Sequence, residues 1–193
     1  MEELYQVMSS HVALSAAAWE ATKTVVRRRS YRKKAYIYQA NHIWREIFFI
    51  QTGCIRHYYT LANGEDVTCD FSMEGAFLTD FLSLNQQTPS QYNYLTLEET
   101  ELISFQLDDL LHLYSTFPEI ERFGRLMAEK AANRVSLMAH SLLMDSPEER
   151  YKKLLEEKKD LIKRVPQKFI AHYLGIKPES LSRIRKRISQ NQG

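Results

Sequence analysis

The segment QKFIAHYLGIKPESLSRIRKRI, residues 167–188, restricts the possible folds of this chain more than any other stretch of the sequence. Gly175 can adopt the left-handed backbone that ends a helix beginning near Pro166. Pro178 has the fixed φ angle that suits the first turn of a second helix, running to about Ile188. Two helices joined by a turn of about three or four residues form a helix-turn-helix. The sequence therefore predicts this motif.

Small and apolar residues fall where the two helices of such a motif must pack. Ala171 is small at the position where the helices cross, which allows a close approach. The shared core is predicted to consist of Ile170, Leu174, Ile176, Leu181 and Ile184. A helical hairpin with a cationic exterior is the alternative interpretation of the segment.

The outward face of the second helix carries side chains that suit the major groove of DNA. Arginine can pair with guanine O6 and N7, and glutamate can accept a hydrogen bond from cytosine N4. We predict that Glu179, Ser180 and Arg183 read bases. Contacts to the DNA backbone orient a protein without specifying sequence. For these contacts the segment offers Lys168, Lys177, Ser182, Lys186 and Arg187.

Charge is distributed unevenly along the chain. Residues 150–193 contain 13 Lys and Arg against 4 Asp and Glu, a balance of +9, whereas residues 1–149 contain 13 basic and 20 acidic residues, a balance of −7. This asymmetry indicates two units with different partners, and the basic unit is a candidate for binding a polyanion.

Short strands are predicted between about residue 25 and residue 105. Runs rich in aromatic and β-branched residues, such as EIFFI and CIRHYY, are separated by turn signals, and Asn63-Gly64 is a strong hairpin signal. A short helix capped by Ser15 precedes them. Many short strands at close spacing are typical of a sandwich or small barrel. The predicted fold class is α+β.

A long helix is predicted to begin near Pro118, because a mainly apolar stripe with spacings of three and four runs from Ile120 to Ser141. Its length indicates that part of the stripe contacts another chain as in a coiled coil; packing on its own domain alone is the alternative. Ser146 and Pro147 signal a fresh helix start. We therefore predict three regions, 1–117, 118–145 and 146–193.

Several function classes have no support in the sequence. No window approaches the roughly 18 apolar residues of a membrane span, and the first residues lack the cations of a signal peptide, so a cytoplasmic protein is expected. Cys54 and Cys69 form neither a redox pair nor an iron–sulfur ligand set. His42, His57 and His112 are scattered, so no metal site is predicted, and nothing resembles a nucleophile elbow or a P-loop. We expect no catalytic residues.

These features together resemble the Crp/Fnr family of bacterial transcription regulators, over nearly the whole chain. Residues 45–84, including the Phe-Ile-x-x-Gly turn at Phe49 to Gly53, resemble the family's cyclic-nucleotide-binding jelly roll, and residues 164–188 resemble its DNA-binding end, closest to the short regulators of Bacteroidetes-type bacteria. The resemblance implies a homodimer formed through the long helix, a palindromic operator in double-stranded DNA, and contacts to RNA polymerase.

The resemblance also indicates how this chain departs from the family. Members carry Arg-Glu-x-x-x-Arg in the recognition helix, and here Pro178 replaces the first Arg while Glu179 and Arg183 match. The operator should therefore differ from the best-known one. A truncated wing is expected, with "LIKRVP" as a single wing-like strand whose Lys163 and Arg164 contact the DNA backbone.

The implied nucleotide pocket is degenerate. Cyclic-AMP-binding relatives use a Gly-Glu pair and, about ten residues later, an Arg followed by Ser or Thr. Thr79-Asp80 and Ser90-Gln91 stand at these positions here. A carboxylate without an arginine has the wrong sign for an anionic phosphate. We therefore expect an unidentified effector or none, with cyclic AMP disfavoured and no cofactor. A signalling or protein-interaction module without specific DNA binding is the alternative function.

Overall fold

The structure is a computed structural model that describes residues 1–190; residues 191–193, the last of the predicted third region, lie outside the described part. The chain divides into two compact units. The N-terminal unit comprises Met1–His57 and Phe71–Ala132. The C-terminal unit comprises Tyr58–Asp70 and Asn133–Gly193, the latter described up to residue 190. None of the described helices has the length and apolar character needed to cross a membrane.

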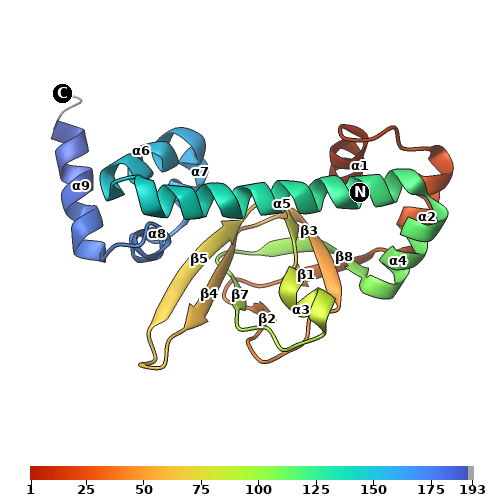
Figure 1. The fold of residues 1–193 in the computed structure, drawn as a ribbon, viewed down its shortest axis with the longest axis horizontal. Coiled ribbons are helices and arrows are strands. Elements are labelled where there is room, and N and C mark those ends of the chain that lie inside the picture. The colour runs from red at the N-terminus through yellow and green to blue at the C-terminus, as the bar shows by residue number, and fades with distance from the viewer. Residues whose placement is uncertain (191–193) are drawn as a thin grey trace. The chain divides into compact units, whose positions relative to one another are not determined.

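Two four-stranded sheets form the β-rich part (Figure 1). One has the order β1-β8-β3-β6 and the other β2-β7-β4-β5. The pairs β1–β8, β3–β8, β3–β6 and β2–β7 are all antiparallel. The strands are β1 (Arg27–Tyr31), β2 (Tyr36–Tyr38), β3 (Glu46–Thr52), β4 (Ile55–Thr60), β5 (Asp66–Ser72), β6 (Phe77–Leu78), β7 (Asn93–Thr96) and β8 (Thr100–Gln106).

Nine helices are described. They are α1 (Glu2–Ser9), α2 (Ala16–Val25), α3 (Phe81–Gln86), α4 (Leu107–Thr116), α5 (Pro118–Met144), α6 (Pro147–Glu157), α7 (Lys159–Arg164), α8 (Gln167–Tyr173) and α9 (Pro178–Gln190). The long helix therefore begins at the predicted residue. Ser15 accepts a hydrogen bond from the Ala18 N–H, and Ser146 forms a capping box with Glu149, so both predicted helix starts are confirmed.

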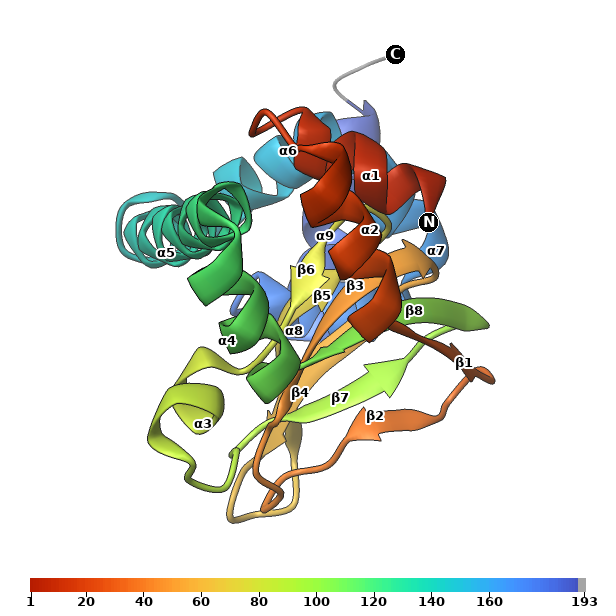
Figure 2. The same cartoon turned by 90° about the vertical axis from the view of Figure 1, so that its right-hand side faces the viewer.

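The strand β3 separates two apolar cores because successive side chains point to opposite faces of its sheet. Phe48 and Ile50 pack with Trp44 in the core of the β-sandwich. Phe49 packs on the other face, in a core that α1, α2, α4 and the first part of α5 complete. Figure 2 shows α1 and α2 over β3 and β8. The α+β prediction of a β-sandwich followed by a long helix and C-terminal helices is confirmed.

One predicted element is wrong. "LIKRVP" was expected to form a wing-like strand, but residues up to Arg164 belong to α7, where Leu161 is buried, and only Val165 has an extended backbone. Burial of Leu161 from a helical turn outweighs the β preference of the short run. Lys163 and Arg164 therefore lie at the end of a helix. The helices α1, α3 and α7, the strand β1 and the two-residue strand β6 were not predicted as separate elements.

Candidate nucleic-acid interface and effector pocket

The turn between α8 and α9 forms because Gly175 ends α8 in the left-handed conformation, with φ of +68°. The Gly175 N–H donates to the His172 carbonyl, and the Ile176 N–H donates to the Ala171 carbonyl. This pair of bonds is a Schellman motif, which satisfies the last carbonyls of the helix. Pro178 then begins α9. The two helices have the predicted boundaries to within about two residues.

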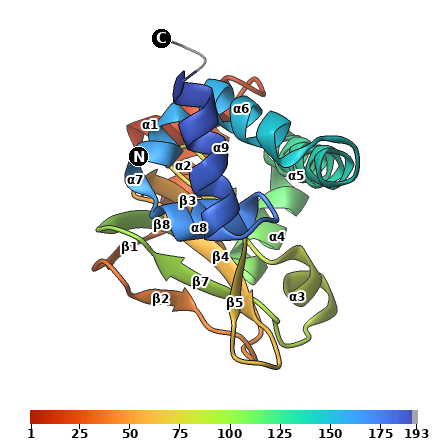
Figure 3. The same cartoon turned by 90° about the vertical axis from the view of Figure 1, so that its left-hand side faces the viewer.

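The predicted core of the motif is present. Ile170, Ala171, Leu174, Leu181 and Ile184 are buried, and Ile176 is half-buried. Ile188, which was not assigned to the core, is also buried and extends the apolar face of α9 by one turn. Figure 3 shows α8 and α9 with α6. The buried apolar face of α9 fixes which of its other side chains point outward.

The outward face of α9 presents most of the predicted DNA-contacting residues. Glu179, Ser182, Arg183 and Lys186 are exposed and follow one another at spacings of three and four, so they share one face. Ser180 is half-buried at the edge of that face. Within residues 1–190, Arg183 and Lys186 have no ion-pair partner. Their cationic groups are therefore available to an external acceptor.

The remaining residues predicted to contact the DNA backbone differ in their surroundings. Lys177 is exposed at the turn before α9. The Lys168 ammonium lies 4.8 Å from the centre of the Phe169 ring, a cation–π distance. Lys163 is paired with Asp160 at 3.3 Å. Arg164 is half-buried at the end of α7, which places it less favourably for a phosphate than the exposed lysines.

Arg187 has a structural partner that spacing along the sequence could not predict. Its guanidinium lies 2.6 Å from Glu148 of α6, and Lys152 contacts the same carboxylate at 2.9 Å. The hydrogen bond from Lys152, together with the positive charge of Arg187, holds the pKa of Glu148 below its usual range. Arg187 therefore connects α9 to α6, in addition to its predicted role as a phosphate contact.

Arg150 joins three segments of the C-terminal unit. Its guanidinium donates to the carbonyls of Leu174 at the end of α8 and Asp145 between α5 and α6, at 2.9 and 2.7 Å, with a longer bond of 3.5 Å to Leu142 of α5. These carbonyls lie at helix ends, where no intrahelical donor remains. Arg150 thus positions the helix-turn-helix on α5 and α6.

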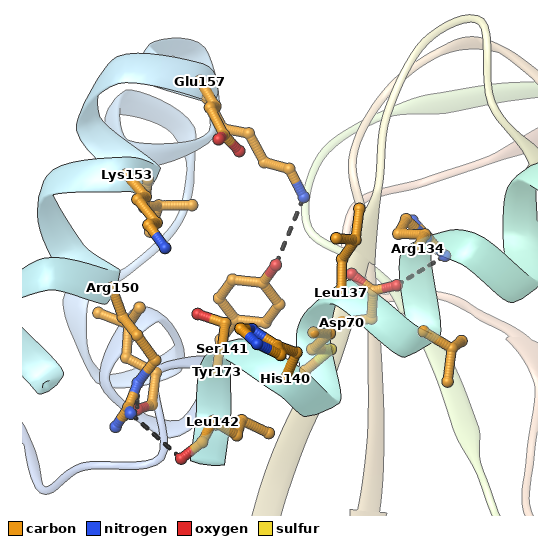
Figure 4. Close-up of a pocket in the computed structure, with 15 residues that line it drawn as sticks. Asp70, Arg134, Leu137, His140, Ser141, Leu142, Arg150, Lys153, Glu157 and Tyr173 are labelled. Atoms are coloured by element: carbon orange, nitrogen blue, oxygen red, sulfur yellow. Dashed lines mark hydrogen bonds and ion pairs between the residues drawn. The ribbon is translucent and has the colours of Figure 1, made fainter. Parts of the chain in front are cut away.

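A pocket of about 360 Å³ lies beside this arginine in the C-terminal unit. Figure 4 shows Arg150, Lys153 and Tyr173 at its wall, with the Arg134–Asp70 ion pair drawn as a dashed line. Lys153 pairs with Asp145 at 2.7 Å, and this pairing, with a hydrogen bond from Ser141, holds the pKa of Asp145 below its usual range. Arg134, Lys153 and Arg150 of the wall thus already have partners in the C-terminal unit.

The four residues of the expected effector pocket do not form an open anion site. Asp80 is buried and caps α3: one carboxylate oxygen accepts the N–H groups of Leu82 and Ser83 at 3.1 and 3.2 Å. The other oxygen accepts the Ser90 hydroxyl at 2.6 Å. A carboxylate therefore already occupies the backbone donors that could otherwise face a phosphate oxygen.

The other two pocket residues take no part in this network. The Thr79 hydroxyl donates to the Glu46 carbonyl at 3.3 Å, and Gln91 is exposed. Among the described residues, no cluster of three or more His, Cys, Asp or Glu has the geometry to hold a metal ion.

Sequence reasoning missed Arg150, the Arg187–Glu148 pair and the role of Asp80 as a helix cap. Arg150 and Glu148 lie in the first turn of α6, but their partners are 24 and 39 residues further along the chain. Only the cap had a local signal, an aspartate directly before a helix-forming run.

Comparisons with known proteins agree with this architecture. Residues 28–117 match the family described as cyclic nucleotide-binding domain. FixK2 from Bradyrhizobium japonicum is 20% identical, with a TM-score of 0.75 over 87% of this chain and 86% of that chain. The c-di-GMP-responsive global regulator CLP from Xanthomonas campestris is 14% identical, with a TM-score of 0.72 over 92% of this chain and 93% of that chain. The Thermus thermophilus catabolite activator protein is 17% identical, with a TM-score of 0.57 over 93% of this chain and 85% of that chain. No curated protein matches the chain in sequence.

Proposed function

We propose that this chain is a dimeric, sequence-specific DNA-binding transcription regulator of the cytoplasm. Two findings support the proposal: residues 28–117 match the cyclic nucleotide-binding domain, and the chain has the fold of Crp/Fnr regulators, which are a non-enzymatic family. In this proposal residues 1–117 form the sensor, 118–145 the dimerisation helix and 146–193 the DNA-binding region. Contacts to RNA polymerase are inferred from the family resemblance alone.

The observation that carries the proposal is the exposed face of α9. A Schellman turn and a buried apolar face hold this helix on α8, and Glu179, Arg183 and Lys186 project from the opposite side. A recognition helix must combine a fixed orientation with free donors for base edges. A basic tail that only carries charge requires neither feature.

A second copy of the chain is the proposed partner of the C-terminal half of α5. Leu137 is 71% exposed and Leu143 84% exposed, and the pairs Val135–Leu142 and Leu137–Met144 are each seven residues apart. The two pairs lie on different sides of the helix, so a coiled-coil seam would use one of them, and exposed apolar side chains of this kind suit contact with another chain. Two copies would present two recognition helices to a palindromic operator.

Substituting Arg183→Ala tests DNA recognition. If Arg183 pairs with a guanine, the variant should lose about 1 to 3 kcal/mol of affinity for the operator, roughly 5- to 150-fold, because a bidentate contact is removed. The operator is first selected from random DNA at a stated salt concentration, and affinity is then measured by fluorescence anisotropy. The mass in sedimentation and the far-UV circular dichroism should not change.

Lys159→Ala is the matched control, because Lys159 is an exposed cation of α7 outside the predicted contact set. It should weaken binding only slightly and equally for all sequences. Unchanged binding of the Arg183→Ala protein to every selected sequence would favour the alternative, a signalling or protein-interaction module without specific DNA recognition.

Cyclic AMP is expected not to bind with an affinity tighter than about 1 mM, because the Asp80 carboxylate occupies the α3 donors and no arginine replaces the usual phosphate ligand. Isothermal titration calorimetry measures this directly. A saturable heat in the micromolar range, or operator binding that depends on cyclic AMP, contradicts the interpretation of Asp80 and Ser90. If no such heat is observed, any effector of the proposed sensor differs in chemistry from cyclic AMP.

A further inference from the structure

A second cavity, of about 90 Å³, lies entirely in the N-terminal unit, between α4, the first part of α5 and the helix-covered face of the β1-β8-β3-β6 sheet. Its wall includes Ile47, Phe105, Leu110, Phe123, Met127 and Ala131, and none of its lining residues is charged. An apolar wall with no ion pair distinguishes this cavity from the pocket beside Arg150.

The cavity lies on the opposite side of the sheet from the core of the β-sandwich. Phe105 belongs to the helix-side core and Ile47 packs against both cores, whereas Phe48 and Leu102 on the same strands belong to the core around Trp44. Thr79 lines the cavity, but Asp80 and Ser90 do not. The cavity therefore shares Thr79 with the degenerate nucleotide pocket but does not include the carboxylate of Asp80.

Tyr114 lines the cavity and carries a polar group, its phenol hydroxyl. No hydrogen-bond partner of its hydroxyl occurs among residues 1–190. Gly124 makes room for this hydroxyl, because a Cβ at that position would overlap the phenol oxygen. Burial, with a smaller contribution from the charge of Glu121, raises the pKa of Tyr114 to about 12. The phenol is therefore neutral and a hydrogen-bond donor at physiological pH.

We propose that this cavity binds a small, uncharged and mainly apolar molecule, about one ring in size, whose single polar group meets the Tyr114 hydroxyl. Apolar cavities of roughly this order stay dry and take up molecules such as benzene. A charged ligand would lose its hydration without gaining an ionic partner, which is costly. Five of the lining residues, from Ile120 to Ala131, belong to α5. The assignment goes beyond the proposed function and does not depend on DNA binding.

Methionine methyl resonances provide a local readout on the full chain. Met8 and Met127 line the cavity, whereas Met138 and Met144 lie in the C-terminal unit. With 13C-methyl methionine, titration with p-cresol or toluene should shift the Met8 and Met127 signals saturably and leave those of Met138 and Met144 in place. Benzoate at pH 7 should shift none of them. Equal or unsaturable shifts at all four methyl groups, or a matching response to benzoate, overturn the proposal.

Two variants separate the roles of shape and hydroxyl. Tyr114→Phe should bind toluene as before but lose a preference for p-cresol of about fivefold, the contribution of one hydrogen bond. Ala131→Leu, which fills the cavity from α5, should abolish both titrations, whereas Ala132→Leu, on the exposed neighbouring position, should preserve them. Unchanged p-cresol binding by a folded Ala131→Leu protein, or a preference for p-cresol that survives Tyr114→Phe, contradicts the assignment.

Discussion

Replacing Arg150 with alanine is expected to lower the free energy of unfolding of the C-terminal unit by about 3 kcal/mol, because several charge-assisted hydrogen bonds are lost together. The carbonyls of Leu174 and Asp145 accept from this guanidinium at 2.9 and 2.7 Å. Without it, the ends of α8 and α5 lose their donors. Arg150→Lys should recover little, because an ammonium cannot reach separate carbonyls with the geometry of a planar guanidinium.

The two units can be followed separately during unfolding. Trp19 and Trp44 both belong to the N-terminal unit, whereas the C-terminal unit contains no tryptophan up to residue 190. In urea, the Arg150→Ala protein should show an earlier helical transition by circular dichroism and an unchanged tryptophan transition. Lys152→Ala, an exposed position of the same helix, should lower stability by no more than about 0.5 kcal/mol. A shift no larger than that of the Lys152→Ala control contradicts the positioning role.

The contacts of Arg150 also explain why the helix-turn-helix was easier to predict than its attachment to α5 and α6. The helix-turn-helix depends on residues within about twenty positions of one another, and Gly175 and Pro178 mark its turn through backbone angles alone. Its attachment to α5 and α6 depends on Arg150 and on the Arg187–Glu148 pair. No periodicity connects residues that are far apart in the chain, so these contacts needed the structure.

In the N-terminal unit, too, local patterns were easier to predict than the role of a single residue. The predicted strand runs match β2, β3, β4, β5, β7 and β8, because aromatic and β-branched runs separated by turns have a strong local signal. Asp80 is different: comparison with the family pattern identified it as a missing ligand position, whereas the structure gives it a cap on the six-residue helix α3. A helix that short has almost no periodic signal.

The wing prediction failed for a related reason. "LIKRVP" contains β-branched residues before a proline, which is a local signal for an extended segment. In the C-terminal unit, residues 159–164 form a helical turn that buries Leu161. Tertiary packing thus decided the conformation of a segment whose local preference was weak.

Gly53→Ala is expected to lower the free energy of unfolding of the N-terminal unit by at least about 3 kcal/mol, because strain and overlap act together. Gly53 follows β3 with φ of +115°, a conformation that side chains rarely adopt. A Cβ there would lie 2.8 Å from the Cβ and 2.9 Å from the Cα of Thr100, at the start of β8. Backbone at this position cannot move without disturbing the β3–β8 ladder.

Gly75→Ala provides the matched control, since Gly75 also has a positive φ, +76°, in the same unit, but a Cβ there has nothing within 4 Å. It should cost only the backbone strain, about 1 to 2 kcal/mol. Urea unfolding followed by the fluorescence of the fully buried Trp44 measures both variants. Equal losses for the two substitutions would show that strain alone accounts for the glycine of the Phe-Ile-x-x-Gly turn. A larger loss at Gly53 would instead assign that glycine to the close approach of β8.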